Sequence, residues 1–203
     1  VVDWTGTRLK YLSRIEQREH MHLIFLHGVP GVGKRTIAKQ LAQELGFAFL
    51  DFQNLTQLLG PVFGYSSETF GELRNASYKQ ILESAMQLPD DGLIASFTYD
   101  QHIDLGHYAT FVESARASEG IGLFLGLTCD DEELKGRVDA PDRHSAKISD
   151  LQLMEDDFGN SQLDMPDLPG PSITINTTGE TPEHTVHNIM AMLPDGMKSN
   201  ISF

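Results

Sequence analysis

The chain has 203 residues, of which 29 are Asp or Glu and 15 are Lys or Arg, so its formal net charge is −14. A sequence pI of about 4.8 excludes general binding to nucleic acid or to anionic membranes, because both partners require a basic surface. The length and a hydrophobic fraction of 40% are enough for one domain with its own core.

The single cysteine, Cys129, excludes an internal disulfide framework and favours a reducing, cytoplasmic location. The apolar runs are far shorter than the roughly 20 residues that cross a bilayer. We expect one domain over residues 21–194, followed by a tail at 195–203. Residues 1–20 lack the apolar stretch of a secretory signal, and we interpret them as an N-terminal extension that need not belong to the native protein.

Short apolar runs alternate with segments of helical periodicity from residue 21 onward. This alternation predicts an α/β domain of three layers around a parallel sheet. Helical patterns cover residues 36–45, 67–87 and 182–193, and Gly46, Pro89 and Pro194 mark their ends. The five expected strands are residues 23–27, 47–51, 92–97, 121–129 and 172–176.

A glycine-rich segment follows the first expected strand and opens the first expected helix. Its Gly-x-x-x-x-Gly-Lys spacing allows backbone N–H groups to surround a phosphate while the lysine reaches the terminal phosphate oxygens. A plain strand-to-helix connector is the alternative. A dinucleotide-binding loop fits poorly, because the third glycine of that motif is Thr36 in this chain. The predicted phosphate ligands are Gly28, Val29, Pro30, Gly31, Val32, Gly33, Lys34, Arg35 and Thr36.

The loop departs from the usual pattern directly after its lysine. Ser or Thr normally provides a magnesium ligand there, but this chain has Arg35, and a hydroxyl follows only at Thr36. Consecutive helical residues point about 100° apart, so Thr36 does not simply replace the missing hydroxyl. Arg35 either adds positive charge near the phosphates or lies on the solvent face.

With these motifs the chain resembles the P-loop kinases, which include nucleoside monophosphate, shikimate and gluconate kinases and chloramphenicol phosphotransferase. More narrowly it is similar to uncharacterised bacterial AAA-type proteins whose loop reads Gly-Pro-Pro-Gly-Val-Gly-Lys-x-Thr. Further matches to that group are Leu127-Thr128-Cys129-Asp130, Arg137-Val138, Pro141-Asp142-Arg143 and Ala146-Lys147-Ile148-Ser149. The resemblance covers residues 21 to about 193 and implies a nucleotide-kinase-like order for the five strands.

The resemblance also implies a lid near residues 136–150 that closes over the phosphates. Its basic residues are Arg137 and Arg143, as catalytic groups, and Lys147, as a phosphate ligand. A solvated basic helix and loop is the alternative. Outside residues 1–20, seven Lys or Arg residues gather in the phosphate-loop region and the proposed lid: Lys34, Arg35, Lys39, Lys135, Arg137, Arg143 and Lys147.

A carboxylate at the end of the second strand orients or deprotonates the acceptor in related kinases, and Asp51 stands there. The usual second acid is replaced by Gln53. Asp100, after the third strand, would help to hold magnesium together with Thr36 and Asp51. The alternatives are a helix-capping role for Asp51 before a turn at 54–59 and a turn role for Asp100.

The leading hypothesis is an ATP-dependent phosphotransferase that uses Mg²⁺, with Lys34 and Asp51 as catalytic residues. Its acceptor would be a small hydroxylated molecule or a nucleotide, bound over residues 52–83 with Phe63, Tyr65 and Tyr99 available for stacking. We expect no nucleic-acid or membrane partner, and a monomer or homodimer. The alternatives are a nucleotide-binding regulator or weak ATPase, and a toxin-like or antibiotic-modifying kinase.

Overall fold

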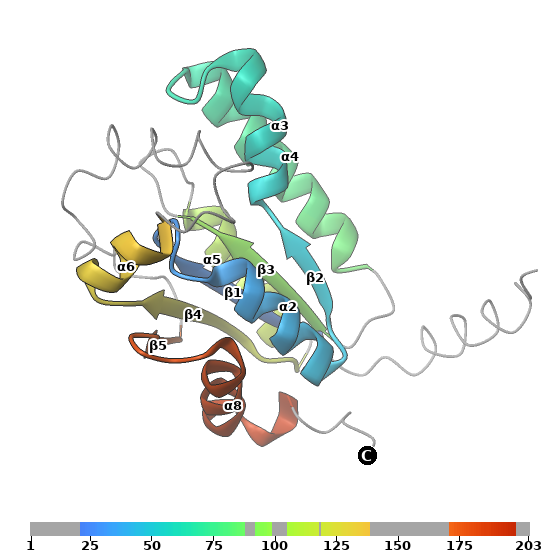
Figure 1. The fold of residues 1–203 in the computed structure, drawn as a ribbon. Coiled ribbons are helices and arrows are strands. Elements are labelled where there is room, and N and C mark those ends of the chain that lie inside the picture. The colour runs from blue at the N-terminus through green and yellow to red at the C-terminus, as the bar shows by residue number, and fades with distance from the viewer. Residues whose placement is uncertain (1–20, 88–91, 99–104, 118, 139–170, 198–203) are drawn as a thin grey trace, which may run out of the picture.

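The computed structural model describes residues 21–87, 92–98, 105–117, 119–138 and 171–197. These residues form a sheet of five parallel strands in the order β2-β3-β1-β4-β5 (Figure 1). The α/β class and the five-stranded parallel sheet expected from the sequence are therefore confirmed. The strands are β1 (His22–Gly28), β2 (Ala48–Asp51), β3 (Gly92–Phe97), β4 (Gly122–Thr128) and β5 (Ser172–Asn176).

Helices cover both faces of the sheet, which gives the three layers. On one face, α2 and α8 enclose a core that includes Ile24 and Leu26 of β1. On the other face, α4 and α5 pack over Leu23 and Phe25 of the same strand. The described helices are α2 (Lys34–Leu45), α3 (Gln53–Phe63), α4 (Glu68–Ala85), α5 (Leu105–Ala117), α6 (Asp131–Val138) and α8 (Pro182–Met192), followed by a short 3₁₀ turn at Asp195–Met197.

The central position of β1 explains its composition. The strand lies between β3 and β4 and is buried along its whole length. Because both of its faces are covered by helices, it contains an uninterrupted apolar run at residues 23–26 and does not alternate. The carboxyl end of β1, where the glycine-rich loop begins, therefore lies in the middle of the sheet edge.

Local sequence signals fix several helix ends close to where they are expected. The Ser67 hydroxyl accepts a hydrogen bond from the Phe70 N–H and caps α4, and the Thr181 hydroxyl does the same for the His184 N–H in α8. Helix α2 ends at Gly46, whose φ of 68° is in the left-handed region.

Helix α3 is the main difference from the expected elements. Only a turn at 54–59 is expected there, since Gly60 and Pro61 lie within the segment. The helix nevertheless runs from Gln53 to Phe63. Tyr65 packs so tightly on Gly60 that a Cβ there would lie 2.0 Å from its ring. Gly60 lowers the local helix propensity, but the contact with Tyr65 requires a residue without a side chain.

None of the helices in the described ranges combines the length and hydropathy that a membrane-spanning segment needs. The predicted extension at 1–20, residues 139–150 of the predicted lid and residues 198–203 of the tail lie outside the described residues. The domain boundaries therefore stay predictions.

Candidate functional site

The glycine-rich loop has the backbone shape of a phosphate-binding loop. Gly28, Gly31 and Gly33 have φ angles of 148°, 86° and 105°, all in the region that glycine adopts most readily. Gly33 is the N-cap of α2, so the N–H groups of the first turn of that helix point towards the loop. A helix N-terminus with exposed amides attracts anions, and this geometry suits the phosphates of ATP.

Lys34 folds back over this loop. Its ammonium donates hydrogen bonds to the carbonyl oxygens of Gly28 and Val29, each at 2.9 Å, and the residue is buried. The positive charge is therefore held at the mouth of the loop by the backbone that would surround a phosphate. This position is consistent with the sequence-based role of Lys34 as a ligand of the terminal phosphate oxygens.

Asp51 and Arg35 form an ion pair beside the loop. The distance from Arg35 Nε to Asp51 Oδ2 is 3.1 Å, and the two side chains are 55% and 6% exposed, respectively. Asp51 Oδ1 accepts hydrogen bonds from the Gln53 N–H at 3.1 Å and from the Ser96 hydroxyl at 3.3 Å. The sequence leaves two roles open for Arg35, and neither anticipates this pairing.

The two predicted magnesium ligands in the described residues, Thr36 and Asp51, do not by themselves form a conventional magnesium site. Magnesium requires a near-octahedral shell of oxygen ligands, but the nearly buried Asp51 carboxylate already holds a guanidinium. Thr36 is exposed on α2, and Asp100 lies outside the described residues. Within the described ranges no cluster of three or more His, Cys, Asp or Glu residues could hold a metal ion. The loop thus fits ATP better than the surrounding side chains fit a metal.

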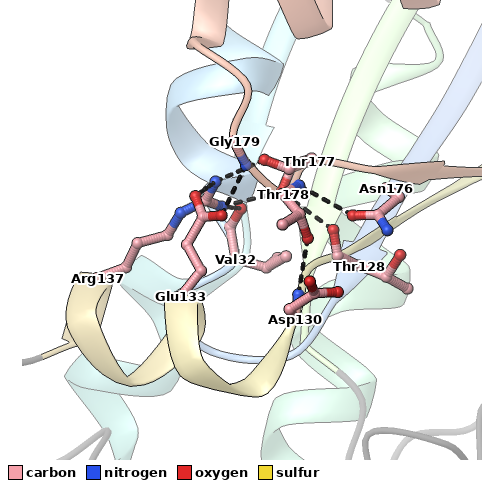
Figure 2. A network of polar contacts seen from close by, with 9 residues as sticks. All are labelled: Val32, Thr128, Asp130, Glu133, Arg137, Asn176, Thr177, Thr178 and Gly179. Carbon is pink, nitrogen blue, oxygen red and sulfur yellow. Dashed lines mark hydrogen bonds and ion pairs between the residues drawn. The ribbon is translucent and has the colours of Figure 1, made fainter.

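Arg137 joins three parts of the structure (Figure 2). Its Nη1 donates to the carbonyl oxygen of Val32 in the phosphate loop at 3.1 Å and to the Thr177 hydroxyl at 2.9 Å. Its Nη2 donates to the Thr177 carbonyl oxygen at 2.7 Å and pairs with Glu133 one turn earlier on α6. Arg137 thus lies next to the loop, as a lid residue should, but its guanidinium is engaged in contacts within the protein. Its catalytic role stays a prediction.

The segment Thr177–Gly179 completes this network and was not singled out from the sequence. The Thr177 hydroxyl donates to Thr128 O at 3.0 Å, while the Thr178 hydroxyl accepts the Asp130 N–H at 2.9 Å. The Gly179 N–H donates to Glu133 at 2.7 Å, and this bond lowers the pKa of the Glu133 carboxyl, with a smaller contribution from Arg137. A cluster of turn residues directly after the last strand is the sequence signal that places this segment at the same sheet edge as the phosphate loop.

Two buried basic residues near this edge were also missed. His27 directly precedes the loop and is 1% exposed, and burial together with the nearby charge of Lys34 lowers its pKa to about 4. Arg74 on α4 is 3% exposed, and its guanidinium lies 5.0 Å from the centre of the Phe70 ring. Neither residue belongs to a motif, so only the packing reveals their burial.

The position of Arg74 follows from the course of α4. Tyr78, one turn later, donates a hydrogen bond of 2.9 Å to the carbonyl oxygen of Phe52, the residue after Asp51. Leu82, a further turn on, packs in the core with Leu23 and Leu93 near the starts of their strands. Arg74 therefore lies towards the carboxyl edge of the sheet, on the side of Asp51.

Two of the remaining predicted residues, Phe63 and Tyr65, lie in the described part of the chain. Tyr65 packs edge-on against Phe70, with ring centres 5.7 Å apart, and so belongs to the α3–α4 packing. Phe63 at the end of α3 is 39% exposed. Three other predicted residues, Tyr99, Arg143 and Lys147, lie outside the described residues.

The fold and the phosphate loop together define a P-loop protein, as the sequence predicts. The chain belongs to the family of AAA domains, whose model matches residues 24–158.

Two relatives, each named "Putative adenylate kinase", match most of the chain. The protein from Thermococcus kodakarensis is 26% identical over 187 residues, which cover 88% of this chain and 89% of the relative. The protein from Thermococcus gammatolerans is 24% identical over 180 residues, with the same coverage of 88% and 89%.

Solved structures of small-molecule kinases share the fold. Shikimate kinase from Acinetobacter baumannii, in complex with shikimate, has 17% identity and a TM-score of 0.58, and the match covers 93% of this chain and 99% of that one. A gluconokinase from Sinorhizobium meliloti has 16% identity and the same TM-score of 0.58, with 86% and 92% covered.

Proposed function

We propose that the protein is an ATP-dependent phosphotransferase that transfers the γ-phosphate to a small molecule or a nucleotide. The observation that carries the proposal is the position of Lys34 over the phosphate loop, at the carboxyl end of the central strand β1. Phosphoryl transfer depends mainly on positioning and charge neutralisation, and this loop supplies both through backbone amides and one fixed cation.

Asp51 is the residue we propose for holding the acceptor. Its Oδ1 is fixed by bonds from Gln53 and Ser96, so the carboxylate has a defined orientation at the end of β2. Parallel α/β sheets bind their ligands outside the carboxyl ends of the strands, and Asp51 and the phosphate loop share that edge. The Asp51 Oδ2 accepts no hydrogen bond from the described residues, and it would accept one from an acceptor hydroxyl placed beside the exposed Arg35 side chain.

We further propose a nucleoside monophosphate as the first acceptor to test. Two observations support this choice. The two Thermococcus relatives are named as adenylate kinases. Arg74 is a buried positive charge one turn before Tyr78, which bonds to the residue after Asp51, and it would favour an anionic group such as a phosphate.

We also propose roles for magnesium and for the lid. Magnesium would be bound to the ATP phosphates. Arg143 and Lys147 would bring positive charge to these phosphates from the lid. We propose a cytoplasmic protein, monomeric or homodimeric, that acts without a nucleic-acid or membrane partner.

Replacement of Lys34 tests the phosphotransferase directly. Lys34→Ala and Lys34→Met should each lower ATP-dependent phosphorylation by at least about 100-fold, because the main cation facing the transferred phosphate is lost. Turnover should be measured with AMP, other nucleoside monophosphates, shikimate and gluconate as acceptors. Lys39→Ala, which removes an exposed lysine from the same helix, is the matched control and should retain activity. Unchanged ATP binding and turnover in both Lys34 variants would show that the assignment is wrong.

A nucleotide-binding regulator with little catalysis is a second candidate. The Arg35–Asp51 ion pair favours it, because the pair covers the carboxylate that an acceptor would use. ATP binding without phosphorylation of any acceptor in the panel would support the regulator, while transfer to one acceptor would exclude it.

A further inference from the structure

Arg35 occupies the position after Lys34 at which a Ser or Thr hydroxyl normally provides a magnesium ligand. The arginine turns towards the end of β2, where its Nε lies 3.1 Å from Asp51 Oδ2. The residue that replaces the usual metal ligand therefore contacts Asp51, which the sequence also predicts as a metal ligand.

Arg35 covers the one Asp51 oxygen that still has capacity for a metal ion. An ionised carboxylate offers about four lone-pair sites. Gln53 and Ser96 donate to its Oδ1, while its Oδ2 is buried, accepts no hydrogen bond within the described ranges and faces Arg35. Since the Asp51 side chain is only 6% exposed, it cannot turn freely to present another edge.

Charge gives a second reason why a metal and Arg35 exclude each other. Arginine side chains in proteins carry a positive charge on the guanidinium. A magnesium ion on Asp51 would have its oxygen ligands at about 2.1 Å and would stand within a few ångströms of that guanidinium. Two like charges so close together repel strongly at a site that is partly shielded from water. The Arg35–Asp51 pair, by contrast, is neutral without a metal.

We infer that Arg35 takes the place of the metal as the cation partner of Asp51, so that the protein binds ATP with little dependence on magnesium. Arg35 is then a positioning residue: it holds Asp51 by an ion pair and leaves magnesium to the ATP phosphates and water. The inference rests on the proposed function only in requiring that the chain binds ATP.

The test measures how strongly magnesium and ATP binding are coupled. Calorimetric titration of the full chain with ATP, in EDTA and then in saturating Mg²⁺, gives two dissociation constants. For the unchanged protein we expect the two constants to agree within about threefold. Arg35→Ser restores a hydroxyl and frees Asp51, so the constant in Mg²⁺ should become at least tenfold lower than in EDTA, a coupling of about 1.4 kcal/mol. Arg35→Lys, which keeps the charge, should behave like the unchanged protein.

Asp51→Asn tests whether Asp51 is the residue that binds the metal in the Arg35→Ser protein. In the protein that keeps Arg35, Asp51→Asn should leave the magnesium dependence of ATP binding as it is. In the Arg35→Ser protein, it should remove the gain in ATP affinity that Mg²⁺ gives. Titration with Mn²⁺, followed by electron paramagnetic resonance, reports the metal directly and should show a tighter Mn²⁺ site only in Arg35→Ser with ATP bound. This readout does not depend on turnover.

Two results would overturn the inference. One is a large magnesium effect in the unchanged protein that Asp51→Asn removes, since Asp51 would then be a metal ligand despite Arg35. The other is an Arg35→Ser protein, folded by circular dichroism, with no gain in magnesium coupling; if that variant does not fold, Arg35→Thr is judged by the same criterion. Failure of every variant to bind ATP in any buffer would instead overturn the proposed function, and this inference with it.

Discussion

Gly28 is the residue at which backbone geometry and neighbouring structure restrict the sequence most clearly. It ends β1 with a φ of 148°, a conformation that residues with a side chain rarely adopt. A Cβ at this position would also lie 2.5 Å from the carbonyl oxygen of Leu127 on β4, which is backbone and cannot move aside cheaply. The backbone conformation and the close contact with β4 therefore both require glycine at the start of the phosphate loop.

Gly28→Ala should therefore lower both stability and ATP affinity. We expect the free energy of unfolding to fall by about 2 kcal/mol or more, because the alanine must either clash or displace the loop from β4. Urea unfolding followed by fluorescence measures the first effect, and calorimetry with ATP measures the second.

Gly136→Ala is the matched control, because Gly136 lies in α6 with no atom within 4 Å of an added Cβ. Alanine favours a helix over glycine, so this variant should gain about 0.5–1 kcal/mol of stability. A Gly28→Ala protein as stable as the unchanged chain, with the same ATP affinity, would contradict the proposed constraint.

At the scale of elements, the Arg137 side chain provides several of the contacts that attach α6. Arg137 binds the phosphate loop at Val32 O and the segment after β5 at Thr177, so it links three stretches that are distant in sequence. The helix has only eight residues, and isolated helices of that length are not stable in water. The position of α6 therefore rests on tertiary contacts, of which this guanidinium provides several.

Arg137→Ala should lower the free energy of unfolding by about 2 kcal/mol, because it leaves carbonyl and hydroxyl acceptors without their charged donor. Amide hydrogen exchange in α6 and in residues 177–179 should become faster than in the unchanged protein, while exchange in the central strands should change less. Lys135→Ala, which removes an exposed charge from the same helix, should change neither quantity. If Arg137→Ala kept full stability and normal exchange but lost turnover, the sequence-based catalytic role would be the correct one.

The sequence predicts elements well where one local signal dominates. The apolar runs of β1 and β3, and the caps at Ser67 and Thr181, identify their elements within a few residues. Helix α3 is missed because Gly60 and Pro61 oppose it locally, and packing by Tyr65 outweighs them.

In the candidate site, too, local motifs are predicted from the sequence and contacts between distant residues are not. The phosphate loop is contiguous in sequence, so its spacing alone predicts it. The Arg35–Asp51 pair and the contacts of Arg137 join residues from different elements. Such contacts depend on which strands are neighbours, and no local pattern in a single sequence contains that information.

At the scale of the whole molecule, the strand order places β1 at the centre of both cores. His27, near the carboxyl end of this strand, packs between the rings of Phe97 and Phe124, with centres 5.9 Å and 6.3 Å away. A proton on this imidazole would bring a charge into the most buried layer of the domain, close to Lys34. Its titration therefore affects the stability of the entire fold.

The global stability should depend on pH through His27. Its pKa is lowered from 6.5 to about 4 in the folded state, so the unfolded chain binds the proton first as the pH falls. The stabilising contribution of the neutral imidazole is thus complete above about pH 6.5, decreases between pH 6.5 and pH 4, and is lost below that range. The two pKa values correspond to a total loss of about 3 kcal/mol.

Urea unfolding from pH 7.5 to pH 4.5 measures this loss, and His27→Leu isolates its source. Many carboxylates also destabilise an acidic protein in acid, so only the difference between the two proteins reports on His27. The variant should lose clearly less stability across this interval, whereas His187→Leu, a change at an exposed position on α8, should follow the unchanged protein. Parallel pH profiles for the His27→Leu variant and the unchanged protein would mean that the imidazole is already protonated in the fold or titrates at its ordinary pKa.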